Sequence, residues 1–353
     1  MNPDDKIALT QYAHGAGCGC KIAPHVLTEI LHTKTPQPAN QLLLVGNETN
    51  DDAAVYDLGN GKALIATTDF FMPIVDDAFD FGRVAAANAI SDVYAMGGSP
   101  VLAIAILGWP VNKLPTALAQ QVLEGARAIC AEAGVSLAGG HSIDTLEPMF
   151  GLSVNGFIDI AHLKRNNTAR EGDLIFVTKP LGVGILSTAQ KRHVLAEEDK
   201  QILMDQLTRL NSVGTMLGKI KGVTAMTDVT GFGLLGHLIE MAEGSGLSAM
   251  LNYDAVPKLP SLPTYIQQTV IPDATYRNWN AYSGKTFFGE SVNVAEAFMV
   301  LPDPQTNGGL LFSVNETAVP DVLSILKQSG LSNFTEPIGR FVKKEEKTVR
   351  VEK

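Results

Sequence analysis

The sequence predicts a two-domain protein of the α/β or α+β class, and three observations lead to this prediction. The chain has 353 residues, which corresponds to about two domains of ordinary size. Its composition, 45% hydrophobic and 18% charged, is that of a folded globular protein. Segments typical of strands and of helices are mixed in both halves of the chain, which excludes a helical bundle or a β-sandwich.

The first half is predicted to begin with a glycine-rich arm, residues 1–22. We expect this arm to be mobile, because glycine loses more backbone freedom on ordering than any other residue. A helix is expected to begin near Pro24, which suits a first helical turn, and Asn60-Gly61 predicts a hairpin turn. The other expected elements are strands at 41–45, 53–58, 63–68, 100–107 and 149–158, and helices at 82–96 and 115–133.

A polar and basic segment at 161–172 is expected to connect the two domains. This boundary gives an N-terminal domain at 23–165 and a C-terminal domain at 166–353. The second half predicts strands at 173–178 and 310–314, helices at 181–192, 197–217 and 232–242, and a loop around Pro257, Pro260 and Pro263.

Charge and cysteine content exclude several classes of protein. The chain has 27 Lys+Arg against 37 Asp+Glu, a net charge of −10, which argues against nucleic acid or an anionic membrane as the main partner. Three cysteines are too few for a disulfide-rich scaffold or a four-cysteine zinc site. The N-terminal residues lack the pattern of a signal peptide, and the longest apolar run, 101–107, is too short to cross a bilayer. We therefore expect a cytoplasmic location.

Acidic residues at the ends of apolar segments are candidates for chemistry. Asp52 lies between two predicted strands, and Asp69 and Asp228 follow strand-like runs. Such carboxylates suit a hard cation, although an aspartate at a strand end also commonly caps a turn. On the helix after Asp69, Asn88 and Asp92 lie four residues apart, opposite the apolar side. This pair predicts a metal or phosphate contact, with an ordinary solvated helix face as the alternative.

Two glycine-rich segments, 138–142 and 230–237, are predicted to form turns. Backbone N–H groups in such turns can bind phosphate oxygens. Neither segment ends in the Gly-Lys-Ser/Thr of the Walker A motif, so both could equally be structural turns, with His141 a packed side chain.

The cysteines of the arm are the most distinctive feature of the sequence. Only one residue separates Cys18 from Cys20, whereas the thioredoxin motif needs two. The adjacent Lys21 favours a thiolate, which makes the pair a candidate soft nucleophile or acceptor. The alternative is an ordinary pair of exposed thiols. Cys130 lies within a predicted helix and is expected to be packed.

The segment 14–21, together with the motifs at 46–55, 67–71, 88–92, 138–142 and 226–233, resembles the signatures of the selenophosphate synthetase (selenide, water dikinase) family. The resemblance extends from about Leu9 to about Arg340, and the combination of motifs is highly specific. It implies an enzyme that converts ATP, hydrogen selenide and water to selenophosphate, AMP and orthophosphate. It also implies the two-domain fold shared with aminoimidazole ribonucleotide synthetase, whose N-terminal domain forms the homodimer and the nucleotide site.

The resemblance also implies roles for individual residues. Cys18 occupies the essential position, which holds cysteine or selenocysteine in the family, and Lys21 matches the essential lysine. Several Mg²⁺ ions are expected on Asp52, Asp92 and Asp228, and potassium dependence is a family trait. A partner protein that delivers selenium is a further expectation. Contacts to ATP are expected from Lys21, Thr49, Asn50, Asp51, Asp69, Asp92, Gly140, His141 and Ser142.

The sequence departs from the family pattern at Asn307, where a serine is expected before Gly308-Gly309. Two other functions remain open. One is another ATP-dependent enzyme of the same superfamily, such as aminoimidazole ribonucleotide synthetase or a hydrogenase-maturation dehydratase, although the arm with Cys18 and Lys21 argues against it. The other is a non-catalytic selenium or metal carrier, which would give the aspartates no role.

Overall fold

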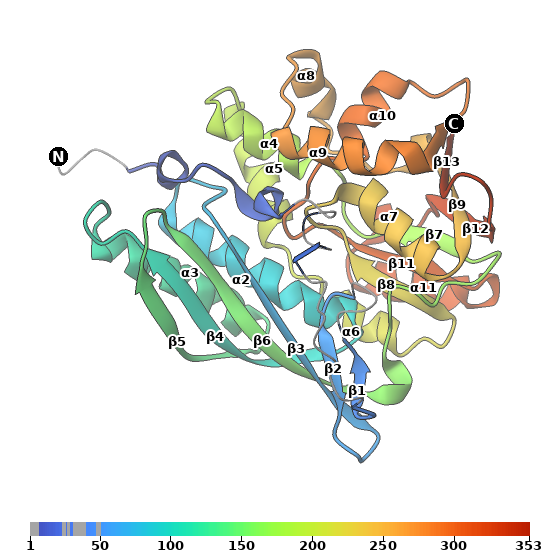
Figure 1. Ribbon diagram of the computed structural model, residues 1–353, viewed down its shortest axis with the longest axis horizontal. Coiled ribbons are helices and arrows are strands. Elements are labelled where there is room, and N and C mark those ends of the chain that lie inside the picture. Colours follow the sequence, from blue (N-terminus) through green and yellow to red (C-terminus); the bar gives the residue numbers. More distant parts are fainter. Residues whose placement is uncertain (1–6, 23–25, 27–28, 31–39, 47–50) are drawn as a thin grey trace.

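The computed structural model contains two β-sheets, one in each half of the chain, and residues 7–22, 26, 29–30, 40–46 and 51–353 are described (Figure 1). The start of the helix predicted near Pro24 and the candidate ATP contacts Thr49 and Asn50 lie outside the described residues. No helix in the described part of the chain is long and apolar enough to cross a membrane.

The N-terminal sheet has six strands in the order β1-β2-β3-β6-β4-β5. Most neighbours are antiparallel, and β4 and β5 are parallel. The predicted hairpin around Asn60-Gly61 is confirmed, because it joins the antiparallel strands β2 and β3. The strands are β1 (Leu43–Val45), β2 (Ala54–Asp57), β3 (Lys62–Phe71), β4 (Ser99–Trp109), β5 (Ser136–Asp144) and β6 (Met149–Asp159).

Two helices, α2 (Ala78–Ala95) and α3 (Thr116–Glu132), cover one face of this sheet (Figure 1). No helix among the described residues covers the other face, which is called the bare face below. Helix α2 begins earlier than predicted because the Asp77 side chain accepts the Asp80 N–H and caps it. The two helices approach closely through glycine: a Cβ on Gly82 would lie 1.9 Å from the carbonyl oxygen of Val122. Only glycine fits at such a contact.

The C-terminal sheet has seven strands in the order β10-β13-β9-β12-β7-β11-β8. Its strands are β7 (Leu174–Val177), β8 (Val223–Asp228), β9 (Leu247–Asn252), β10 (Thr286–Phe288), β11 (Leu310–Val314), β12 (Gly339–Lys343) and β13 (Val349–Glu352). The helices of this half are α4 (Val183–Lys191), α5 (Glu197–Thr208), α6 (Val213–Gly218), α7 (Gly233–Gly244), α8 (Leu262–Gln267), α9 (Asp273–Tyr282), α10 (Val294–Val300) and α11 (Val319–Gln328).

Two predictions of secondary structure are wrong for identifiable reasons. The single helix expected at 197–217 is divided into α5 and α6, because the carbonyl of Arg209 turns away to accept hydrogen bonds from the side chains of Lys179 and Asn307. The segment 138–142 is part of strand β5 rather than a turn. Its glycines permit a bulge beside β4, where a Cβ on Gly140 would lie 2.2 Å from the Ala105 carbonyl oxygen.

Candidate active site

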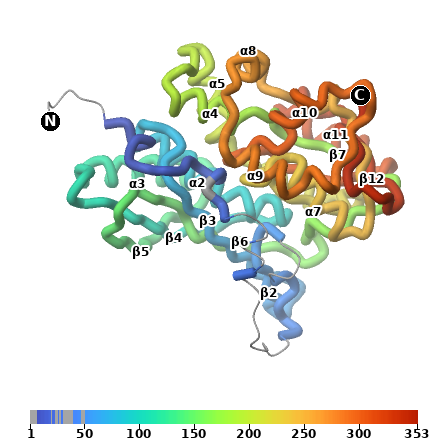
Figure 2. Tube along the Cα trace, turned by 45° about the horizontal axis from the view of Figure 1, so that its top comes forward, coloured from blue at the N-terminus to red at the C-terminus, as the bar shows by residue number. Residues whose placement is uncertain are grey.

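Residues 7–22 of the glycine-rich arm are docked across the junction of the two halves (Figures 1 and 2). The N–H of Gly17 donates to the Met72 carbonyl just after β3 (3.1 Å). On the other side, Arg277 of α9 donates to the Gly19 carbonyl (2.5 Å), and Lys191 of α4 donates to the carbonyls of Ala13 (3.1 Å) and Gly15 (3.3 Å). Both halves therefore hold the arm, and its predicted mobility stays a prediction.

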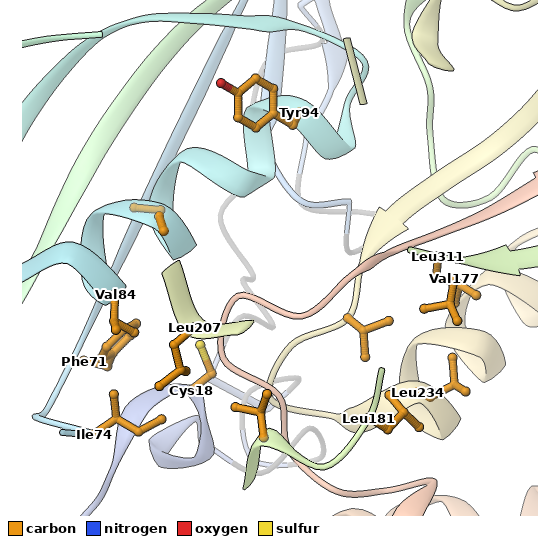
Figure 3. Packing of buried hydrophobic residues seen from close by; sticks show 14 of the residues in the cluster. Cys18, Phe71, Ile74, Val84, Tyr94, Val177, Leu181, Leu207, Leu234 and Leu311 are labelled. Atoms are coloured by element: carbon orange, nitrogen blue, oxygen red, sulfur yellow. The ribbon is translucent and has the colours of Figure 1, made fainter. Parts of the chain in front are cut away.

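Cys18 is the buried centre of this docked arm. It is 2% exposed and belongs to the same hydrophobic cluster as Ile74 and Leu207 (Figure 3). Its thiol donates to Asn88 Oδ1 (3.2 Å), and its N–H donates to Thr306 Oγ1 (3.0 Å). The alternative of an ordinary exposed thiol is therefore wrong for Cys18, whereas the side chain of Cys20 lies outside the described residues.

The protonation of Cys18 differs from the expectation. Burial raises the pKa of the thiol well above its ordinary value, and the charge of Asp69 raises it further. Lys21 acts in the expected direction and lowers the pKa of Cys18, but it does not outweigh burial. In the docked arrangement Cys18 is a neutral thiol. Cys130 is buried in α3 as predicted.

Asn88 connects the arm to two other segments of the site. Its Oδ1 accepts both the Cys18 thiol and the N–H of Asn307 (2.7 Å), and its Nδ2 donates to Asp69 Oδ2. Asn88 is 0% exposed, because α2 lies between its own sheet and the C-terminal half. The alternative of a solvated helix face is therefore wrong.

Three aspartates reach the same region from different elements. Asp52 Oδ1 accepts from Thr227 Oγ1 (2.7 Å), and Asp52 Oδ2 is buried without a hydrogen-bond partner among the described residues. Asp92 Oδ2 accepts from Thr67 Oγ1 of β3 (2.5 Å). Asp228, at the end of β8, accepts from Ser91 Oγ (2.5 Å), so α2 and β8 meet at this point.

These carboxylates repel one another in a poorly solvated space. Burial, followed by the charge of Asp228, raises the pKa of Asp52 and of Asp92 well above the ordinary value. Burial also raises the pKa of Asp228 to about 6. Among the described residues, no group of three or more His, Cys, Asp or Glu side chains is arranged to hold an ion. The unpaired Asp52 oxygen and the all-oxygen donors nevertheless fit a hard cation such as Mg²⁺, which would relieve the repulsion.

Lys21 brings a positive charge to this acidic region. Desolvation opposes its charge, but the carboxylates of Asp69, Asp92 and Asp228 raise its pKa. Its stem passes Gly231, where a Cβ would lie 3.2 Å from Lys21 Cδ and 2.5 Å from the Cys18 carbonyl oxygen. Gly231 thus permits the arm to lie directly on the turn that precedes α7.

Not every predicted site residue joins this group. The side chain of Asp51 accepts the backbone N–H of Asn166 (2.7 Å), a contact between the two halves. Gly140, His141 and Ser142 lie on β5, at the edge of the sheet, with β6 and β4 between them and β3. At the usual strand spacing this separation is about 14 Å. Among the described residues, no hydrogen bond joins these three residues to Cys18, whose N–H and thiol donate to Thr306 and Asn88.

The sequence analysis noted Asn307 only as a departure from the family pattern and did not predict Lys179, yet both residues organise the site. Asn307 has a positive φ of 50°, and its side chain donates to the carbonyls of Leu207 (2.8 Å) and Arg209 (2.9 Å). Lys179 is buried and donates to the carbonyls of Arg209 and Asn307 (both 2.7 Å). Asparagine tolerates this backbone conformation well, so the departure from serine was a usable signal. Nothing in the local sequence marks Lys179.

The chain matches two family models along most of its length. The model described as "AIR synthase related protein, N-terminal domain" matches residues 50–158, and the model described as "AIR synthase related protein, C-terminal domain" matches residues 170–352. Solved structures with the same fold include thiamine-monophosphate kinase from Stenotrophomonas maltophilia, with a TM-score of 0.64 and 20% identity, covering 88% of this chain and 91% of that one. The hydrogenase maturation protein HypE in complex with ATP also has a TM-score of 0.64 at 20% identity, covering 87% of this chain and 83% of that one.

Curated relatives are much more similar in sequence. The "Selenide, water dikinase" of Yersinia pseudotuberculosis serotype I is 53% identical over 346 residues, which cover 98% of each chain. The protein of the same name from Photobacterium profundum is 57% identical over 314 residues, which cover 89% of this chain and 90% of that one. The expected two-domain fold is confirmed, and the chain belongs to the selenide, water dikinase family of AIR synthase related proteins.

Proposed function

We propose that the protein is a selenide, water dikinase, which uses ATP, selenide and water to form selenophosphate, AMP and orthophosphate. The observation that carries this proposal is the docked arm, which places Cys18 and Lys21 beside the carboxylates of both halves. Relatives with 53% identity over 98% of the chain carry the same activity in their names. This arrangement pairs a soft sulfur atom with groups suited to phosphoryl transfer.

Each group has a role in this proposal. Mg²⁺ ions held by Asp52, Asp92 and Asp228 would neutralise the charge of the triphosphate and of the transferred phosphoryl group. Lys21 offsets further phosphate charge from the arm, and Asp69 takes part in binding ATP. Cys18 orients or receives selenium next to the transferred phosphoryl group. Potassium dependence and a selenium-delivery partner remain predictions from the family resemblance, as does the cytoplasmic location.

A homodimer is part of the proposal, and the bare face of the N-terminal sheet supports it. Large apolar side chains are exposed on this face, which is unusual for a surface that stays in water. They include Phe70, Leu102, Ile104 and Phe157. A second copy packed on this face and on the β5 edge would bury them. It would also offer His141 and its neighbours a nucleotide held by the partner.

We predict that Ile104→Asp weakens the dimer about 100-fold or more, because Ile104 is 41% exposed on β4 and a carboxylate there would be buried in the interface. Light scattering across a protein dilution series measures the effect. Val294→Asp is the matched control, since Val294 is 44% exposed on α10, away from the N-terminal sheet. Equal behaviour of the two variants would exclude this face as the interface.

Phosphorus NMR of a reaction with ATP, Mg²⁺ and selenide tests the proposed reaction. We expect selenophosphate, AMP and orthophosphate to appear together. Formation of ADP alone would instead support another ATP-dependent reaction of the superfamily. Stoichiometric selenium binding without ATP consumption would support a carrier.

A further inference from the structure

A cleft of about 670 Å³ opens between the docked arm and helices α4 and α9. Four basic residues line it, Lys21, Lys191, Arg192 and Arg277, against one aspartate, Asp273, among the described residues. The whole chain carries a net charge of −10, so the charge of the cleft has the opposite sign to that of the chain as a whole. A cleft lined by one sign of charge raises the local concentration of ions of the opposite sign.

The cleft leads toward Cys18. Gly19, Lys21, Ala274 and Arg277 line both the cleft and a smaller pocket that touches Cys18. The smaller pocket holds only about 10 Å³, roughly the space of one water molecule, so the path toward Cys18 is narrow. The thiol itself donates to Asn88, whose amide group also donates to Asp69. The arm therefore separates an acidic side from a basic side.

An unsatisfied polar group also lies at the cleft. Ser187 of α4 lines it, is 5% exposed, and its Oγ has no hydrogen-bond partner within the described part of the chain. A buried hydroxyl without a partner is costly unless a ligand or water supplies one. Together with the basic side chains, this hydroxyl suits an anion that accepts a hydrogen bond.

We propose that this cleft captures the selenium substrate as the small anion hydroselenide and guides it to Cys18; this assignment rests on the proposed function. Two anionic substrates then reach the arm from opposite sides. ATP binds at the carboxylates with its metal ions, whereas hydroselenide enters through the basic cleft without a metal. The separation gives an acidic protein a way to collect a free anion, and it keeps the two substrates from competing for one entrance.

Thr188 offers a direct test, because it lines the cleft, is half-buried and lies outside the proposed catalytic group. Thr188→Glu adds a negative charge to the cleft, and Thr188→Gln adds nearly the same volume without charge. In full-length protein with saturating ATP and Mg²⁺, selenide is varied anaerobically and selenophosphate is measured. We expect the KM for selenide to be about tenfold higher in the Glu variant than in the Gln variant. The KM for ATP should be the same in both.

Salt provides a second readout. Because attraction to the cleft is electrostatic, kcat/KM for selenide should fall with ionic strength more steeply in Thr188→Gln than in Thr188→Glu. An equal KM for selenide in the two variants would overturn the proposal, as would an equal rise in the KM values for selenide and ATP. Failure of the unmodified protein to form selenophosphate would instead refute the proposed function, so the two failures are distinguishable.

Discussion

Asp52→Asn is expected to reduce ATP consumption by at least about a thousandfold, because it removes the charge that would hold a metal ion against the triphosphate. The contacts of Asp52 in the structure contribute little to the stability of the fold. One of its oxygens is buried without a partner among the described residues, and the charge of Asp228 opposes its ionisation. Asparagine can still accept the hydrogen bond from Thr227 through Oδ1. We therefore expect Asp52→Asn to fold normally.

The sign of the stability effect follows from the raised pKa of Asp52. A carboxyl group whose pKa is higher in the folded state loses stabilising free energy as pH rises above its unfolded pKa. In metal-free protein at neutral pH, Asp52→Asn should therefore have a Tm equal to or higher than that of the unmodified chain.

The measurements for Asp52→Asn are AMP formation over a range of Mg²⁺ concentrations and thermal unfolding without metal. Asp57→Asn is the matched control, since the Asp57 side chain caps the turn after β2 by accepting the Gly59 N–H (2.8 Å), which asparagine can also do. Full activity of Asp52→Asn at limiting Mg²⁺ would remove Asp52 from the site. A large fall in its Tm would show a structural role instead.

The fold could largely be predicted where the pattern is local. Strands β3, β4 and β6 and helix α3 lie close to their expected ranges, because alternation and helical spacing depend on the segment itself. The same spacing placed Asn88 and Asp92 opposite the apolar side of α2. The spacing could not show that the C-terminal half covers the side with Asn88 and Asp92. Periodicity identifies the residues that share a side of a helix, but it does not identify what packs against that side.

The remaining errors come from interactions between distant residues. The break between α5 and α6 depends on Lys179 and Asn307, which are far from it in sequence. The glycines of β5 indicated a turn because their pairing with β4 is not visible in their own sequence. The motif around Cys18 marked the arm, but its docking depends on Arg277 and Lys191 of the C-terminal half. The residue types of the candidate site are thus visible in the local sequence, whereas the contacts that position them are not.

Cys18→Ser is expected to reduce selenophosphate formation by at least about a hundredfold while leaving the arm docked. A serine hydroxyl can make the same hydrogen bond to Asn88 Oδ1, and the backbone contacts to Thr306 and Arg277 do not involve the side chain at position 18. The substitution therefore removes the soft, polarizable sulfur and little else. A loss of activity would then report on chemistry rather than on folding.

Cys20→Ser is the matched comparison for Cys18→Ser, since it makes the same chemical change two residues further along the arm. Selenophosphate formation is measured by phosphorus NMR. We expect a milder effect, because Cys18 contacts Asn88 and, through it, Asp69. An equal loss in both variants would indicate that the two cysteines act as a redox pair. Full activity of Cys18→Ser would show that the thiol is dispensable, and the arm would then serve phosphoryl transfer through Lys21 alone.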